Sequence, residues 1–131
     1  MTSSPSVKLS FFKLNVPDMD AALEFYGQVF GFSIAQTFDE DAFLEHILAL
    51  PGQEAGPNLL LVAYKDGRDV SVGPGHGPVG LVTDDIDTLF ARAIGAGANP
   101  VVPVFDMGPV KVGILLDPWG HELELLQFPA G

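Results

Sequence analysis

Apolar and polar side chains alternate at the start of the chain with the period of two residues that an extended strand has. Over residues 7–16, Leu14 and Val16 fall on one face, and Phe11 and Lys13 fall on the other. Apolar side chains occur on both faces, so we expect each face of this strand to be partly buried.

The spacing of apolar residues changes to that of a helix after Pro17. Asp18 is the expected N-cap, because its carboxylate can accept hydrogen bonds from free backbone N–H groups. Gly31 suits the C-terminal cap. The apolar residues between the two caps predict one stripe of an amphipathic helix: Met19, Ala22, Leu23, Tyr26 and Phe30.

This order of elements occurs twice in the chain. The tripeptide Asp85-Ile86-Asp87 repeats Asp18-Met19-Asp20 at a distance of 67 residues and opens a second apolar stripe with helical spacing. The same distance places a strand near residue 79, before this second helix. The remaining predicted strands lie over residues 32–38, 42–50 and 58–64 in the first half and over residues 99–105, 110–116 and 121–128 in the second.

Two βαβββ modules in one chain of 131 residues predict a single domain of the α+β class, spanning residues 1–131. Module one covers about residues 7–65, a polar, glycine-rich linker covers residues 66–77, and module two covers about residues 78–128. Each helix covers one face of a small sheet, so the opposite faces need another cover. We expect the two mixed sheets to curl around a shared inner pocket, and the residues facing it to carry the function.

The charge of the chain narrows the class of partner. The formal net charge is −11, so no cationic surface is available to displace the counterions of nucleic acid. The same charge disfavours anionic membranes, and no apolar run approaches the roughly 20 residues needed to span a bilayer. The start of the chain has no basic and apolar signal segment, so we expect a cytoplasmic protein. With no cysteine, thiolate chemistry is absent.

Three stretches of the sequence resemble the vicinal oxygen chelate (VOC) superfamily, which includes glyoxalase I, bleomycin-resistance proteins and extradiol dioxygenases. They occur in the order that the family has, and the internal repeat accompanies them. The resemblance implies the paired βαβββ fold that the hydrophobic pattern predicts. The stretches are residues 15–26 leading to Phe30-Gly31-Phe32, residues 82–87, and residues 116–125 with the turn Asp117-Pro118-Trp119-Gly120.

The resemblance also implies where metal-using members of the family take their ligands. The four places are the first and last strands of each module, and in this chain they hold Phe11, Pro78, the apolar residues 59–62 and Glu124. Only Glu124 matches the family pattern, and one carboxylate is far from the three or four ligands of a zinc site. We therefore predict no metal cofactor. A divalent metal held by His76 and Glu124 is the alternative.

Five residues are predicted to face the ligand. Glu122 and Glu124 are two apart on a strand and share one face, where they could attract a cationic group. Glu124 is also the candidate catalytic base, although it could simply pair with Lys13. His121 starts the same strand and is expected to satisfy the turn backbone. The predicted ligand-binding residues are Phe11, Lys13, Trp119, Glu122 and Glu124.

These residues favour a metal-independent protein that binds a small, partly apolar and cationic organic molecule, as the bleomycin-resistance branch does. The main alternative is a glyoxalase-like metal-dependent lyase, isomerase or dioxygenase that uses Glu124. A third hypothesis is a cofactor-free enzyme in which Glu124 acts with Lys13 or His121. The resemblance further implies a homodimer, because small members of the family usually complete their pockets by pairing two chains.

Overall fold

A computed structural model describes residues 5–130 of the chain. Residues 1–4, which belong to the segment searched for a signal peptide, lie outside the described residues. The elements follow the predicted order: β1 (Phe11–Asn15), α1 (Met19–Phe30), β2 (Ser33–Asp39), β3 (Phe43–Ala49), β4 (Asn58–Tyr64), β5 (Val79–Val82), α2 (Ile86–Gly95), β6 (Asn99–Met107), β7 (Val110–Leu116) and β8 (Glu122–Gln127).

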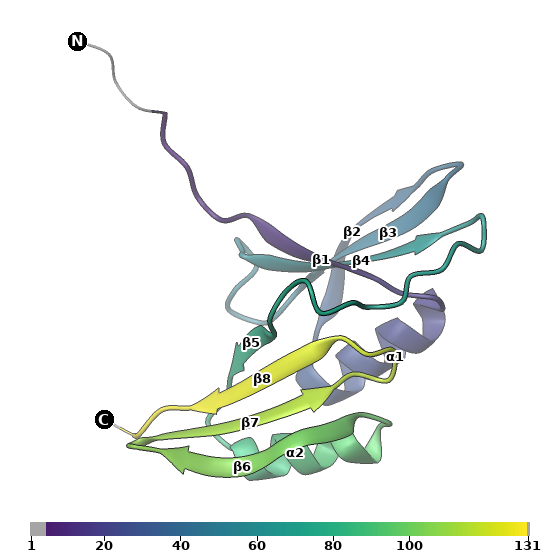
Figure 1. The fold of residues 1–131 in the computed structure, drawn as a ribbon. Coiled ribbons are helices and arrows are strands. Elements are labelled where there is room, and N and C mark those ends of the chain that lie inside the picture. The colour runs from purple at the N-terminus through teal and green to yellow at the C-terminus, as the bar shows by residue number, and fades with distance from the viewer. Residues whose placement is uncertain (1–4, 131) are drawn as a thin grey trace.

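The strands form two four-stranded sheets with the same topology (Figure 1). The strand order is β1-β4-β3-β2 in the first sheet and β5-β8-β7-β6 in the second. In each sheet the first and last strands of the module pair in parallel, and the other pairs are antiparallel. This confirms the predicted α+β fold of two βαβββ modules with mixed sheets.

α1 begins at the predicted cap Asp18, and α2 begins at Asp85, the residue that repeats Asp18 in the second module. The Asp18 side chain accepts a hydrogen bond from the backbone N–H of Ala21, and the Asp85 side chain accepts one from Thr88. Hydrogen bonds from Thr88 hold the pKa of Asp85 below its usual value. Gly31 ends α1 with a φ of 84°, which an L side chain rarely adopts.

One hydrophobic core runs through both modules. Leu14 and Leu61 of the first sheet belong to the same buried cluster as Leu123 and Leu125 of the second. The buried stripe of α1 is shifted from the predicted one toward Phe25 and Val29, because Trp119 of the second module packs against Phe25. The buried residues of α1 are Met19, Ala22, Phe25, Tyr26 and Val29, whereas Leu23 and Phe30 are only partly buried.

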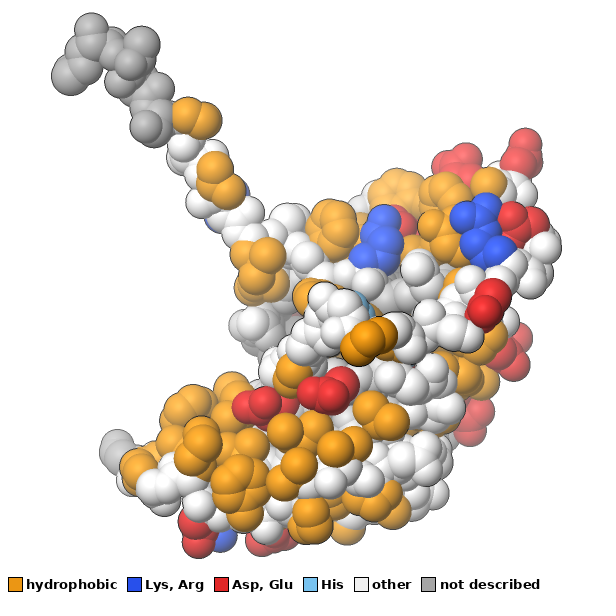
Figure 2. Space-filling model, in the orientation of Figure 1, with side chains coloured by type: hydrophobic (Ala, Val, Ile, Leu, Met, Phe, Trp, Pro, Cys, Tyr) orange, Lys and Arg blue, Asp and Glu red, His pale blue; other side chains and the backbone are white. Residues whose placement is uncertain are grey.

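The first strand is shorter than predicted. It begins at Phe11 rather than at residue 7, and residues 5–10 are exposed, with Val7 at 90% of its full accessibility. Figure 2 shows this segment leaving the body of the domain. No helix within residues 5–130 is long and apolar enough to cross a membrane.

Candidate functional site

Glu122 and Glu124 lie on the face of the second sheet that the helices leave uncovered. On β8 they alternate with Leu123 and Leu125, which are fully buried on the helix side. The strand register places Glu124 between Gly80 of β5 and Ile114 of β7. The predicted common face of the two glutamates is therefore confirmed.

The surroundings of these carboxylates are mostly apolar. Leu126 and Val82 share their face, and Val82 is 66% exposed. In Figure 2, hydrophobic side chains gather over the second sheet. Within residues 5–130, neither glutamate forms an ion pair. The face thus presents two uncompensated negative charges among aliphatic groups.

Lys13 forms an ion pair with Glu45 and not with Glu124, the partner considered in the sequence. Its Nζ lies 2.8 Å from Oε1 of Glu45 on β3 and 5.4 Å from the centre of the Phe11 ring. The alternative in which Glu124 pairs with Lys13 is therefore wrong. The physical reason is register, since β3 and β1 flank β4 in the first sheet whereas Glu124 belongs to the second.

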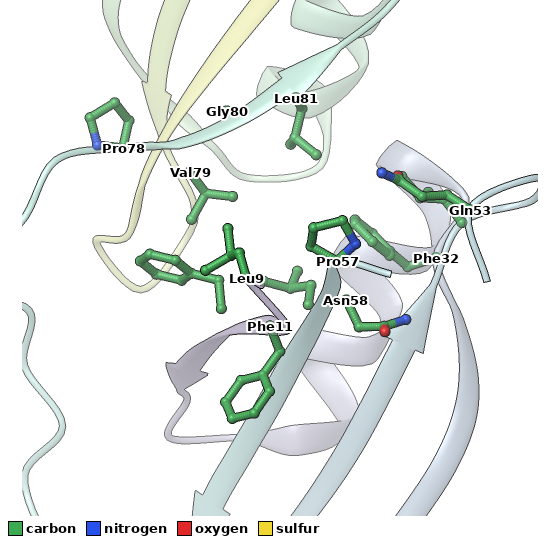
Figure 3. A pocket seen from close by; sticks show the side chains of 13 residues that line it. Leu9, Phe11, Phe32, Gln53, Pro57, Asn58, Pro78, Val79, Gly80 and Leu81 are labelled. Atoms are coloured by element: carbon green, nitrogen blue, oxygen red, sulfur yellow. The ribbon is translucent and has the colours of Figure 1, made fainter. Parts of the chain in front are cut away.

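A cavity of about 320 Å³ lies where the two modules meet. Figure 3 shows side chains from both modules around it, with Phe11 from β1 on one side and Pro78 and Val79 on the other. The volume falls within the usual range for small-molecule pockets, roughly 300–1,000 Å³. The residues that line it are Leu9, Phe11, Phe12, Phe32, Leu50, Gln53, Pro57, Asn58, Leu59, Pro78, Val79, Gly80 and Leu81.

Trp119 does not line this cavity. Its ring packs against Phe25 of α1, with 6.0 Å between ring centres, and it borders a separate hollow beside Gly95 and Ala96 at the end of α2. The turn that carries Trp119 lies against α1, which explains the separation from Phe11. Contact between Trp119 and a ligand of the central cavity stays a prediction that this geometry does not favour.

A buried polar cluster joins the two modules, and the sequence analysis missed it. Asp117 is fully buried, and its Oδ2 accepts a hydrogen bond of 2.7 Å from the Tyr26 hydroxyl. Nδ1 of His121 lies 2.6 Å from the same oxygen. The other oxygen accepts from the backbone N–H groups of Trp119 and His121. Burial, together with the adjacent Asp117 charge, raises the pKa of Tyr26 well above 10.0, so its hydroxyl stays a donor.

His121 therefore has a different role from the predicted one. The carboxylate of Asp117, not the imidazole, satisfies the turn backbone, and the imidazole is held by that carboxylate. The third hypothesis, in which Glu124 acts with Lys13 or His121, is not supported by any contact, because each partner is held elsewhere. An aspartate at the start of a tight turn is the only signal that the sequence offered for this cluster.

The described residues do not fit the family's metal centre. Phe11 and Pro78 lack donor atoms, and the inner face of β4 presents Leu60 and Val62. His76, the alternative ligand, lies in the linker beside the Phe12 ring, and its Nδ1 bonds the Gly77 carbonyl. Within residues 5–130, no three His, Asp or Glu residues are grouped so that they could hold a metal ion. Glu124 alone matches the donor set.

Known proteins of the glyoxalase type are similar to this chain in sequence and in fold. A probable lactoylglutathione lyase of Vibrio parahaemolyticus is 30% identical over 122 residues, which cover 87% of this chain and 86% of the relative. A glyoxalase family protein of Bacillus cereus superposes with a TM-score of 0.84 at 15% identity over 99% of both chains. The trypanothione-dependent glyoxalase I of Leishmania major gives 0.80 at 20% identity over 93% of this chain and 87% of its own.

The family profile matches nearly the whole chain, over residues 8–125. The match includes the first strand of each module, both helices and the turn before β8. The chain belongs to the glyoxalase/bleomycin resistance protein/dioxygenase superfamily.

Proposed function

We propose that the protein binds a small, partly apolar organic molecule with a cationic group, without the help of a metal ion. The observation that carries the proposal is the pair of glutamates, Glu122 and Glu124, without an ion pair on an aliphatic face. Unpaired carboxylates beside apolar surface attract a cation whose own apolar parts cover that surface. The net charge of −11 adds a long-range attraction for cations.

A second copy of the chain would complete the site. The face of the second sheet leaves Val82 and Phe105 substantially exposed, and a ligand of ordinary size would cover only part of it. Exposed apolar area of this kind is characteristic of an interface. The homodimer expected from the family is thus part of the proposal.

The test uses bleomycin, which the family name mentions, and simple aromatic amines as probes in thermal unfolding. A ligand at one hundred times its dissociation constant stabilises the protein by about 2.7 kcal/mol. We expect the stabilisation to fall in Glu124→Gln and in Glu122→Gln. Glu40→Gln removes the same charge from an exposed loop and serves as the matched control. Equal stabilisation of all four proteins, or no stabilisation of the wild type by any cation, would contradict the proposal.

The names of the relatives favour a second candidate, a lactoylglutathione lyase activity. In this alternative, which the family resemblance suggests, Glu124 would be one ligand of a divalent metal. The test incubates the protein with nickel, zinc, manganese and iron and measures bound metal and melting temperature. Tight stoichiometric binding that is lost in Glu124→Ala would overturn the metal-independent proposal. Stabilisation of the protein by S-lactoylglutathione, with no stabilisation by bleomycin or the aromatic amines, would favour the lyase activity.

A further inference from the structure

The cavity where the two modules meet has a lining without ionisable side chains. Among residues 5–130, those that line it are apolar except for the carboxamides of Gln53 and Asn58. The chain as a whole has 17 acidic, six basic and three histidine residues. Neither Glu122 nor Glu124, the carboxylates proposed to attract a cation, belongs to this lining. The cavity therefore offers no counter-charge to an occupant that carries a charge.

The side of the cavity that the first module forms is rich in aromatic rings. Phe11, Phe12 and Phe32 line it, and the rings of Phe11 and Phe12 remain substantially exposed. Val79 and Leu81 of the second module also line it, and they pack against the buried core (Figure 3). An aromatic ring in the cavity would therefore meet other rings and aliphatic groups, which are the surroundings that aromatic rings favour.

Hydrogen bonds hold the loop between β3 and β4, which forms one wall of the cavity. The backbone N–H of Gln53 donates to the Leu50 carbonyl at 3.0 Å, and that of Asn58 donates to the Ser10 carbonyl at 3.1 Å. The Nδ2 group of Asn58 donates to the Leu48 carbonyl at 3.2 Å. A ligand that enters a cavity with fixed walls does not have to order them, which lowers the free-energy cost of binding.

We propose that this cavity binds an uncharged aromatic molecule the size of a two-ring system. At about 30 Å³ for each water-sized group, the volume of about 320 Å³ accommodates on the order of ten such groups. The lining favours a neutral occupant, and the net charge of −11 further disfavours anions. The proposal does not depend on the cationic ligand of the second sheet, which uses other residues.

The test titrates the full chain with 1-naphthylmethanol, a neutral two-ring alcohol, in two-dimensional ¹H–¹⁵N NMR. We expect a dissociation constant on the order of 0.1–1 mM, as a small and mostly apolar ligand allows. The side-chain amide signals of Gln53 and Asn58 and the backbone signal of Gly80 should shift, because these residues line the cavity from both modules. The side-chain amide signal of Gln28, in the separate hollow beside Trp119, should not shift.

A second probe, 1-naphthoate, has the same ring system with a carboxylate in place of the alcohol group. We expect it to bind more weakly than 1-naphthylmethanol by roughly tenfold or more, because no cationic side chain lines the cavity within residues 5–130. Both titrations are carried out at the same pH and ionic strength, so the charge of the probe is the difference that is measured.

The decisive variant is Phe11→Ala, which removes one ring from the wall of the cavity. We expect it to weaken the binding of 1-naphthylmethanol by roughly tenfold. Phe38→Ala is the matched control, because Phe38 is 37% exposed, against 46% for Phe11, and lies on β2 outside the lining. The affinity of Phe38→Ala should stay within about twofold of the wild-type value.

Three results would overturn the proposal: equal affinity of the wild type for the two probes, equal affinity of Phe11→Ala and Phe38→Ala for 1-naphthylmethanol, or shifts confined to residues outside the cavity. A second copy of the chain in the cavity would make the Gln53 and Asn58 signals depend on protein concentration and not on the probe, and this result would overturn it too. Should Phe11→Ala fail to fold, the comparison of the two probes and the location of the wild-type shifts still decide the outcome.

Discussion

Replacing Tyr26 by Phe tests whether the bond between the modules stabilises the fold. The substitution keeps the ring that packs against Phe25 and removes only the donor to Asp117. Asp117 retains three donors, so the loss is one hydrogen bond to a charged group, worth about 2 kcal/mol. Unfolding of 131 residues carries an entropy of about 275 cal/mol/K, so the melting temperature should fall by about 7 °C.

The same variant should change the stability at alkaline pH. The pKa of Tyr26 is raised in the folded protein, so above pH 10 the unfolded chain releases this proton while the folded chain keeps it. The wild type therefore loses stability as the pH rises from 10 toward the folded pKa. Tyr26→Phe should lack this contribution.

Urea unfolding at pH 7 and pH 11 measures both effects. Tyr64→Phe is the matched control, because the Tyr64 hydroxyl has no hydrogen bond within residues 5–130 and its ring stacks on Arg68. It should change the free energy of unfolding by less than about 0.5 kcal/mol. Equal stabilities of Tyr26→Phe and Tyr64→Phe at pH 7, or an unchanged alkaline loss in Tyr26→Phe, would refute the reasoning.

Two further substitutions test packing and helix capping. A Cβ at Gly113 would lie 3.0 Å from the Phe90 ring, so Gly113→Ala should lower the free energy of unfolding in urea by about 1–3 kcal/mol. Gly75→Ala is the control and should not lower it, because nothing lies within 4 Å of a Cβ at Gly75. Equal effects of the two substitutions would contradict the packing argument. Asp85→Ala should destabilise the protein at pH 7, because the lowered pKa of Asp85 shows that its ionised form is favoured in the folded state. This contribution is present above pH 3.8 and is lost as the pH falls through the lowered pKa of Asp85, so the gap between wild type and variant should narrow below pH 3.8. A constant gap would argue against the cap.

Local periodicity was sufficient to predict the elements. Strand alternation placed Leu14 and Val16 on the buried face, the Asp18 cap marked the start of the first helix, and the repeat of its tripeptide marked the start of the second. The internal repeat supplied the second module with the same topology. These features depend on neighbours a few residues apart, which the hydrophobic pattern records.

The functional contacts depend on distant parts of the chain. Tyr26 and Asp117 are 91 residues apart, and their bond exists only because α1 packs against the turn before β8. The partner of Lys13 depends on which sheet each strand joins, so alternation alone could not choose between Glu45 and Glu124. The common face of Glu122 and Glu124 was predictable because a spacing of two fixes it in any strand.

The Tyr26 bond shows how far the two halves of this duplicated architecture have diverged. The 67-residue repeat makes Ala93 the counterpart of Tyr26 in the second module. When the parallel strand pairs of the two modules are aligned, Gln53 is the counterpart of Asp117 in the first module. The bond therefore forms at one corner of the pseudo-symmetric molecule and has no counterpart at the other. It takes its donor from one half and its acceptor from the other, so neither half carries the complete contact. A fusion of two identical modules would therefore lose this contact.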